Sequence, residues 1–159
     1  MKTLVVYYSL SGNCRVVADV LKSSLGAEVL EIKTLKNKKR TKVGKFLWGL
    51  SLIARKKRPA LKPHTVNIND FGLIILGTPV WAWSPSLVML SFLEKTKISG
   101  KKIALFCCHG GGMGKAMEEF KAKLSGNTIV GEIDFANPAH AGGAELNQKI
   151  DEWAKTLKT

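Results

Sequence analysis

Apolar residues along this chain follow two alternating spacings, one typical of buried strands and the other of amphipathic helices. Continuous apolar runs predict five strands, at residues 4–8, 28–32, 71–76, 102–107 and 128–135. Apolar positions that recur every three or four residues predict five helices, at residues 12–25, 43–54, 86–94, 115–124 and 143–157. The pattern therefore alternates strand and helix along the whole chain.

This alternation predicts an α/β fold with one five-stranded parallel sheet. Parallel strands need a crossover between them, and helical crossovers cover both faces of the sheet. The runs at 71–76 and 102–107 are continuously apolar, as expected for central strands. Right-handed crossovers then build a doubly wound three-layer sandwich. The 159 residues suffice for a single domain, 1–159, with a full core.

The composition favours a cytoplasmic protein. Three cysteines, an odd number, argue against a disulfide framework and for a reducing compartment. The first apolar run is too short for the core of a signal peptide. The uncharged stretch 71–93 is long enough to span a membrane, but Pro79 and Pro85 interrupt it. We therefore interpret it as a buried strand, a loop and a helix.

The turn between the first strand and the first helix has the composition of an anion-binding loop. Residues 8–14 read Tyr-Ser-Leu-Ser-Gly-Asn-Cys. Backbone N–H groups at a helix start lack partners within the helix, and the helix dipole favours negative charge there. Ser9 and Ser11 add hydroxyl donors, and Gly12 allows close approach of the backbone. The sequence predicts a phosphate monoester at this turn.

Two further loops should meet the first, because ligands of doubly wound sheets collect at the carboxyl ends of the strands. Residues 78–84 place Trp81 and Trp83 on a loop stiffened by Pro79, and residues 107–114 offer the bare backbone of four glycines. A phosphate site combined with a site for a planar ring describes a mononucleotide. Residues two apart on a loop do not easily share a face, so we expect Trp81, rather than Trp83, to contact the ring.

These three loops resemble those of the flavodoxin-like FMN-binding proteins, and the match spans nearly the whole chain. Residues 9–14 resemble the family's phosphate loop, Ser/Thr-x-Thr/Ser-Gly-x-Thr. Residues 77–81 (Gly-Thr-Pro-Val-Trp) resemble the loop packed against the isoalloxazine, and residues 109–112 (His-Gly-Gly-Gly) the second flavin loop. The resemblance implies a flavodoxin-like sandwich with strand order 2-1-3-4-5, one non-covalent FMN and a redox function.

The resemblance also implies a set of cofactor-binding residues. They are Ser9, Leu10, Ser11, Gly12, Asn13, Cys14, Thr78, Pro79, Val80, Trp81, Ala82, Cys108, His109, Gly110, Gly111 and Gly112. Two features depart from the family's pattern. Cys14 stands where the family usually has Thr, and a thiol donates a weaker hydrogen bond than a hydroxyl. Flavodoxins are typically acidic, whereas this chain has a net charge of +13.

Cys14 and His109 each admit two interpretations. Cys14, at a helix N-terminus, is either a reactive thiol with a lowered pKa or a plain replacement for Thr facing the phosphate. His109 is either a candidate catalytic residue that protonates a substrate or a loop residue without that role. No Cys-x-x-Cys or His-x-x-x-His spacing is present, so we expect no metal site.

Positive charge is concentrated in the middle of the chain, where twelve Lys/Arg and no Asp/Glu lie between Glu31 and Asp70. The helix at 43–54 lies in this stretch. Trp48 and Leu52 are expected on its outer face, near Lys45. The stripe expected to pack on the sheet consists of Val43, Phe46, Leu47, Leu50, Ile53 and Ala54.

The outer face of this helix is either a solvated surface with a stray Trp or a docking patch. A patch extending from Lys33 to Lys62 would suit an acidic protein, an anionic membrane surface or a second copy in a homodimer. We expect no nucleic-acid partner, because the lysines are not interleaved with several aromatic residues.

The charge also bears on the kind of redox protein. Positive charge near a flavin stabilises its reduced, anionic form, which favours an NAD(P)H-linked two-electron reductase of a quinone- or flavin-type acceptor. Lysines near the site could also bind the 2′-phosphate of NADPH. Two alternatives stay open: a one-electron carrier that docks on an acidic partner, and a non-redox binding module that has lost FMN.

Overall fold

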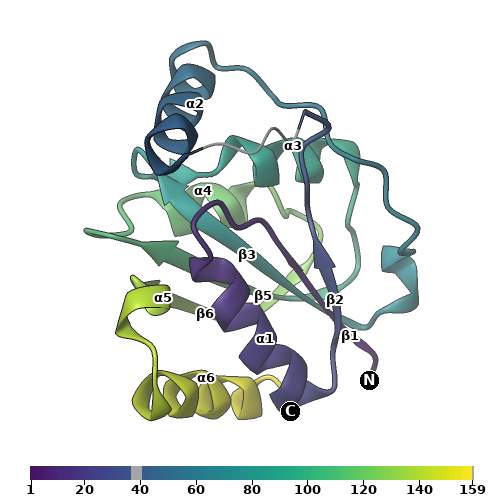
Figure 1. Cartoon of the computed structure of the whole chain (residues 1–159). Coiled ribbons are helices and arrows are strands. Elements are labelled where there is room, and N and C mark those ends of the chain that lie inside the picture. Colours follow the sequence, from purple (N-terminus) through teal and green to yellow (C-terminus); the bar gives the residue numbers. More distant parts are fainter. Residues whose placement is uncertain (37–40, 159) are drawn as a thin grey trace.

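Five parallel strands form one sheet within residues 1–36 and 41–158, the part of the chain that the computed structural model describes (Figure 1). The strands are β1 (Thr3–Tyr7), β2 (Glu28–Glu31), β3 (Leu73–Trp81), β5 (Lys102–His109) and β6 (Thr128–Ala136). Their order, β2-β1-β3-β5-β6, confirms the predicted 2-1-3-4-5 arrangement. A two-residue strand absent from the prediction, β4 (Ser84–Pro85), pairs antiparallel with the end of β3. Lys38, Lys39 and Arg40 of the predicted basic patch lie outside the described residues.

Each predicted helix is present, and the structure adds the short helix α5 (Pro138–Ala141), which the sequence pattern did not predict. The others are α1 (Asn13–Leu25), α2 (Lys42–Ala54), α3 (Leu87–Lys95), α4 (Ala116–Ala122) and α6 (Ala144–Thr156), with a 3₁₀ turn η1 at Ile68–Asp70. Local signals set several ends: α1 begins after Gly12 and ends at Gly26, both with positive φ, and Ser86 caps α3 by accepting from Met89 N. No helix within 1–36 and 41–158 is long and apolar enough to cross a membrane. The cytoplasmic location stays a prediction.

Helices cover the sheet on both faces, with α1 beside α6 on one face and α3 and α4 on the other (Figure 1). Strand β1 shows how one apolar run serves both layers. Leu4 and Val6 enter the core cluster under α3 and α4, whereas Val5 and Tyr7 enter the one under α1 and α6. Successive side chains of a strand point to opposite faces, so a continuous apolar run is needed here.

Gly77 allows the central strands to pack at the rim where the loops emerge. A Cβ at this position would lie 2.0 Å from Cζ of Phe106, which is completely buried. Gly77 also pairs with Tyr7, and its carbonyl accepts from Tyr8 N at 3.3 Å. The ends of β1, β3 and β5 are thus held together at the carboxyl rim.

Strand β3 runs past its predicted end at residue 76. Thr78 and Pro79 still pair with Cys107 and Cys108 of β5, and Val80 pairs with Pro85 of β4. The predicted loop 78–84 is therefore mostly strand, with a tight turn at its tip. Pro79 is tolerated because β1 pairs with β3 only as far as Gly77, so β3 is an edge strand on that side at Pro79.

The predicted orientation of α2 is wrong, because the structure turns this helix by about half a revolution. Leu52 is buried and Trp48 is half-buried, whereas Val43, Phe46, Leu47 and Leu50 are exposed. The Trp48 ring meets Trp81 edge to face, with 6.0 Å between centroids. The inner face of α2 therefore contains Trp48 and Leu52, and the face with the larger number of apolar residues lies outward. Ala54, also predicted to pack inward, is exposed as well.

Candidate functional site

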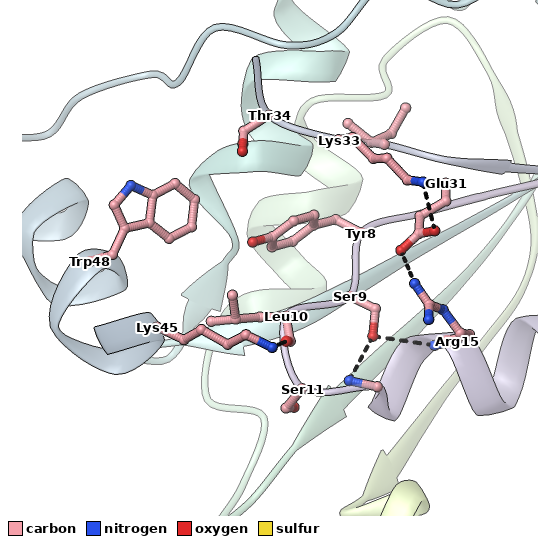
Figure 2. A pocket seen from close by; sticks show the side chains of 12 residues that line it. Tyr8, Ser9, Leu10, Ser11, Arg15, Glu31, Lys33, Thr34, Lys45 and Trp48 are labelled. Atoms are coloured by element: carbon pink, nitrogen blue, oxygen red, sulfur yellow. Dashed lines mark hydrogen bonds and ion pairs between the residues drawn. The ribbon is translucent and has the colours of Figure 1, made fainter. Parts of the chain in front are cut away.

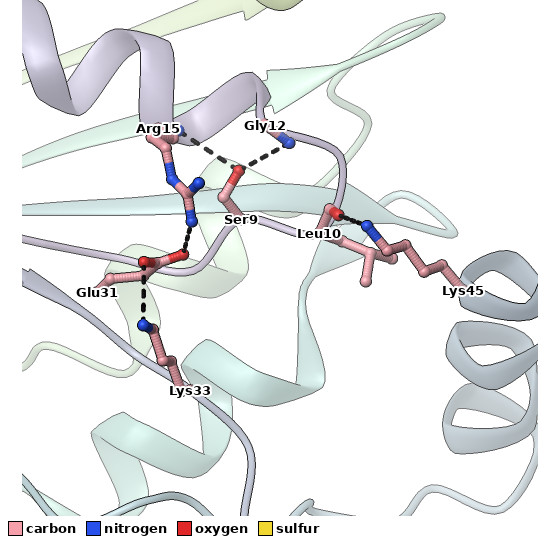
Figure 3. Close-up of polar contacts among 7 residues, drawn as sticks. All are labelled: Ser9, Leu10, Gly12, Arg15, Glu31, Lys33 and Lys45. Carbon is pink, nitrogen blue, oxygen red and sulfur yellow. Dashed lines mark hydrogen bonds and ion pairs between the residues drawn. The ribbon is translucent and has the colours of Figure 1, made fainter. Parts of the chain in front are cut away.

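The turn from β1 into α1 directs two backbone N–H groups at one oxygen. The Ser9 hydroxyl oxygen accepts from Gly12 N at 3.1 Å and from Arg15 N at 3.4 Å (Figure 3). Gly12 has φ 94°, and a Cβ there would meet no atom within 4 Å, so the backbone is open to a ligand. The first turn of α1 contains no acidic residue. The turn is thus organised to receive an anion.

A cleft of about 420 Å³ opens beside this turn, between the ends of β1 and β2 and helix α2 (Figure 2). Its charged lining residues are Arg15, Lys33, Lys45 and one carboxylate, Glu31. Arg15 Nη2 lies 2.6 Å and Lys33 Nζ 3.8 Å from the oxygens of Glu31 (Figure 3). The hydrogen bond to Glu31 raises the pKa of Arg15, so its charge is permanent. Three cations against one carboxylate leave the cleft positive.

Helix α2 is attached directly to the loop. Lys45 Nζ donates to the Leu10 carbonyl oxygen at 3.2 Å, and the Trp48 side chain forms the far wall of the cleft (Figure 2). A charged donor on a backbone carbonyl orients the peptide and adds positive charge to the mouth of the loop.

The second predicted loop forms a two-residue turn between β3 and β4. Ala82 and Trp83 both have positive φ, 48° and 62°, which non-glycine residues adopt at a cost of about 1–2 kcal/mol each. The Trp81 ring is held edge to face by Tyr8, with centroids 5.8 Å apart, and by Trp48 on another side. Trp83 is exposed. The turn therefore presents two aromatic groups at the rim, one clamped and one free to solvent.

Thr78 serves the fold through its side chain. It is completely buried, and its hydroxyl oxygen accepts from Ser86 N at 3.0 Å, which anchors the start of α3. Its role at a cofactor stays a prediction.

The glycine loop after β5 is organised by His109. Gly112 N donates to His109 Nδ1 at 3.0 Å, so that nitrogen carries no proton. The Nε2–H group then donates to Asp134, 2.8 Å away on β6. Both ring nitrogens are thereby engaged, and the imidazole is only 11% exposed. This geometry favours a positioning role for His109, and the catalytic role stays a prediction.

Two glycines of the loop, Gly110 and Gly114, lie close to neighbouring segments. A Cβ on Gly114 would fall 2.5 Å from the Trp83 Cβ, so the absence of a side chain there lets the two loops approach. Asn137, after β6, has φ 44° and its N–H donates to the His109 carbonyl at 2.8 Å. The loops that follow β3, β5 and β6 thus support one another.

The Asn13 side chain makes one hydrogen bond within its own loop and one to helix α5. Its Oδ1 accepts from Ala139 N at 2.9 Å, in α5, and its Nδ2 donates to Ser11 Oγ at 3.4 Å. Asn13 therefore ties the phosphate-type loop to α5, and any contact with a ligand would fall to its backbone N–H.

Cys14 is a core residue, and this contradicts the alternative of a reactive thiol with a lowered pKa, whereas a contact with the phosphate stays a prediction. The side chain is completely buried beside Cys108, in the cluster under α1 and α6. Burial raises the pKa of Cys14 well above its usual value, and the neighbouring Cys108 raises it further. Burial likewise raises the pKa of Cys107 to about 12. Within the described residues no group of three or more His, Cys, Asp or Glu could hold a metal ion.

Comparison with known families decides which fold family this is. The family model described as Flavodoxin matches residues 2–156. The chain belongs to the flavodoxin family. No curated protein matches it. Sequence comparison therefore shows the family of the chain and no individual relative.

Solved flavoprotein structures share the fold of this flavodoxin-family chain. A Lactobacillus acidophilus flavoprotein in complex with FMN is 23% identical, with a TM-score of 0.73 over 96% of this chain and 98% of that one. Oxidised Flavodoxin 2 from Bacillus cereus is 23% identical, with a TM-score of 0.63 over 99% and 98%. A flavodoxin, WrbA-like protein from Agrobacterium tumefaciens is 16% identical, with a TM-score of 0.66 over 99% and 97%.

Sequence reasoning missed several residues that shape this flavodoxin-type rim. Asp134, Asn137, Arg15 and Glu31 were not among the predicted site residues. An Asn before a Pro at the end of a strand, as in Asn137–Pro138, is a recognisable signal for a left-handed turn residue. The Arg15–Glu31 and His109–Asp134 contacts join residues far apart in sequence, and no local pattern reveals them.

Proposed function

We propose that this protein binds FMN and acts as an NAD(P)H-linked two-electron reductase of a quinone- or flavin-type acceptor. The observation that carries the proposal is the β1–α1 turn. Two backbone N–H groups converge there on the Ser9 hydroxyl oxygen, which a phosphate oxygen would replace as their acceptor. The helix start has no acidic residue and lies beside Arg15, Lys33 and Lys45. Such a turn suits a phosphate dianion. Membership of the flavodoxin family supports FMN as the group that carries this phosphate.

The residues present fit the cofactor at both ends. Ser9, Ser11 and the N–H groups from Gly12 to Arg15 would hold the phosphate. Trp81 and the backbone of the glycine loop 109–112 would line the ring, with His109 held in place by Asp134. When bound, FMN supplies the hydride and electron transfer, while the protein supplies binding and orientation. The cations of the cleft would also suit the 2′-phosphate of NADPH.

The decisive test uses two charge variants on the same helix-and-loop unit. Ser11→Asp places a carboxylate at the loop, and Ser23→Asp places one at the other end of α1; both serines are exposed. Like charges about 4 Å apart repel by about 4 kcal/mol at an effective dielectric near 20. FMN affinity, followed by calorimetry or flavin fluorescence, should fall by at least about a hundredfold in Ser11→Asp. It should change by less than about threefold in Ser23→Asp.

The reaction is tested with the FMN-loaded protein. NADPH should be oxidised when a water-soluble naphthoquinone is present. Tight FMN binding without NADPH oxidation would favour the one-electron carrier that docks on an acidic partner. No FMN binding by the natural sequence would overturn the proposal and favour the non-redox module, for which the replacement of Thr by Cys14 is the supporting observation.

A further inference from the structure

One face of α2 exposes large apolar side chains to solvent. Val43, Phe46, Leu47 and Leu50 are 68%, 65%, 59% and 44% exposed. They recur at intervals of three and four residues, so they form a single ridge along the helix. We call these four residues the α2 outer face.

The opposite face of α2 already accounts for the packing of the helix. Gly49 and Leu52 are buried, Trp48 contacts Trp81, and Lys45 reaches the Leu10 carbonyl. A helix that is apolar on both sides is normally buried on both sides. The fold thus uses the inner face and leaves the outer face without a role.

The apolar surface extends beyond the helix on both flanks. On one side a cleft of about 410 Å³ separates α2 from Trp83, which is 70% exposed. On the other side a cleft of about 370 Å³ separates it from Leu35, which is 57% exposed. Within the described residues, the exposed large apolar side chains other than Met1 all lie on this surface.

Basic residues surround the α2 outer face. Lys36 and Lys42 are exposed before or at the start of the helix, and Arg55, Lys56 and Lys57 are exposed after its end. We call these five residues the basic rim. Twelve of the 25 Lys/Arg and none of the 12 Asp/Glu lie between Glu31 and Asp70, so the rest of the chain carries 13 and 12. The excess positive charge of the protein is therefore carried by the segment of the sequence that contains α2.

We propose that α2 docks this protein on an anionic membrane surface. The α2 outer face would enter the boundary between headgroups and acyl chains, with the helix lying in the plane of the membrane. The basic rim would contact the lipid phosphates, as clusters of Lys and Arg on amphipathic helices do. The same geometry points the carboxyl rim of the sheet, with its three loops, toward the bilayer.

Two features favour a membrane over a protein partner. A second copy of this chain would bring the same five cations against the basic rim, which opposes self-association. An acidic protein would satisfy the cations, but a stable protein interface uses about 20–30 residues on each side. The α2 outer face, Leu35, Trp83 and the basic rim together supply eleven. A bilayer needs only apolar groups that protrude and cations around them.

Vesicle binding tests the proposal independently of FMN. The full chain is sedimented with vesicles of phosphatidylcholine alone, or with about a quarter of the lipid replaced by phosphatidylglycerol. Binding to the anionic vesicles should exceed binding to the neutral ones at least about tenfold. The double variant Phe46→Ser, Leu47→Ser should lose that binding by about tenfold or more, with an unchanged melting temperature because both side chains are exposed.

A matched pair of charge variants separates the basic rim from net charge. Arg55→Gln with Lys57→Gln, and Lys97→Gln with Lys123→Gln, each remove two exposed cations, the latter near the opposite rim of the sheet. Only the first pair should weaken binding to anionic vesicles, by about tenfold.

Equal losses in both charge pairs would show attraction by net charge alone and would overturn the proposal. Full binding by Phe46→Ser, Leu47→Ser would also overturn it. So would the absence of vesicle binding together with a dimer, detected by light scattering, that this double variant abolishes. That result would assign the α2 outer face to a second copy of the chain.

Discussion

The β1–α1 turn and helix α2 lie at the same rim of the sheet. The turn bonds or buries its side chains within the fold, whereas α2 exposes large apolar side chains to solvent. In the turn, the Ser9 hydroxyl receives two backbone N–H groups, and Cys14 and Val17 enter the core. In α2, four large apolar residues remain in water. The hydrogen bond from Lys45 to the Leu10 carbonyl joins the two regions.

The contrast is between a turn whose polar groups are bonded within the domain and a helix whose apolar groups are only partly buried. Helix α2 is completed on its inner face alone. The two regions also differ in how closely they pack, which single substitutions can measure.

The largest effect is expected from two glycines, Gly77 of β3, which pairs with the end of β1, and Gly49 of α2. Gly77→Ala would place a methyl group 2.0 Å from the Phe106 ring and should lower the free energy of unfolding by about 3 kcal/mol. Gly49→Ala, in α2, has no atom within 4 Å of the new Cβ and should raise it by about 1 kcal/mol through helix propensity. Urea unfolding measures both. Changes of the same sign in the free energy of unfolding of both variants would contradict the difference in packing between the two sites.

The two faces of α2 provide the next largest difference. Trp48→Ala removes the edge-to-face contact with Trp81 and should lower the free energy of unfolding by about 2 kcal/mol. Phe46→Ala, on the outer face, should change it by less than about 0.5 kcal/mol. Thermal or urea unfolding tests the pair. A larger loss in Phe46→Ala would restore the orientation of α2 that the sequence pattern predicted.

The buried thiols under the loops should make the protein less stable at high pH. Burial raises the pKa of Cys107 from 9.0 to about 12, so the folded thiol stays protonated where the unfolded one ionises. The free energy of unfolding should therefore fall above pH 9, by up to about 1.4 kcal/mol per pH unit from this group. Urea unfolding should give a shallower decline for Cys107→Ala than for the natural sequence. If the free energy of unfolding declined with pH equally in Cys107→Ala and in the natural sequence, the Cys107 thiol would be accessible to solvent in the folded protein.

The smallest expected effect concerns the His109 loop. Asp134→Asn weakens the charge-assisted hydrogen bond to His109 and should lower the free energy of unfolding by about 1 kcal/mol. Glu132→Gln, two residues earlier on β6, removes only an exposed pair with Lys121 and should cost less than about 0.5 kcal/mol. Equal losses of unfolding free energy in Asp134→Asn and Glu132→Gln would mean that the hydrogen bond from His109 to Asp134 adds no stability.

Much of this rim could be predicted from the chain because its determinants are local. The strand-to-helix turn at Ser9–Gly12 depends on residues within one short segment, and so do the positions of the helices. The extent of β3 did not follow from local pattern, since Val80 and Trp81 are held in strand geometry by pairing with Pro85 and Ser84 of β4. The engagement of His109 depends on Asp134, 25 residues away.

The sequence by itself determined the alternation of strands and helices and the turn predicted to bind a phosphate, because apolar periodicity and local backbone preferences act over a few residues. The strand order was expected only from the resemblance of the loops to those of flavodoxin-like proteins. Only the tertiary structure decided that Trp48 faces inward, that Asn13 ties to Ala139 and that Cys14 is sealed in the core. Each of these depends on the shapes and hydrogen-bonding groups of segments brought together by the sheet, and periodicity carries no information about such contacts.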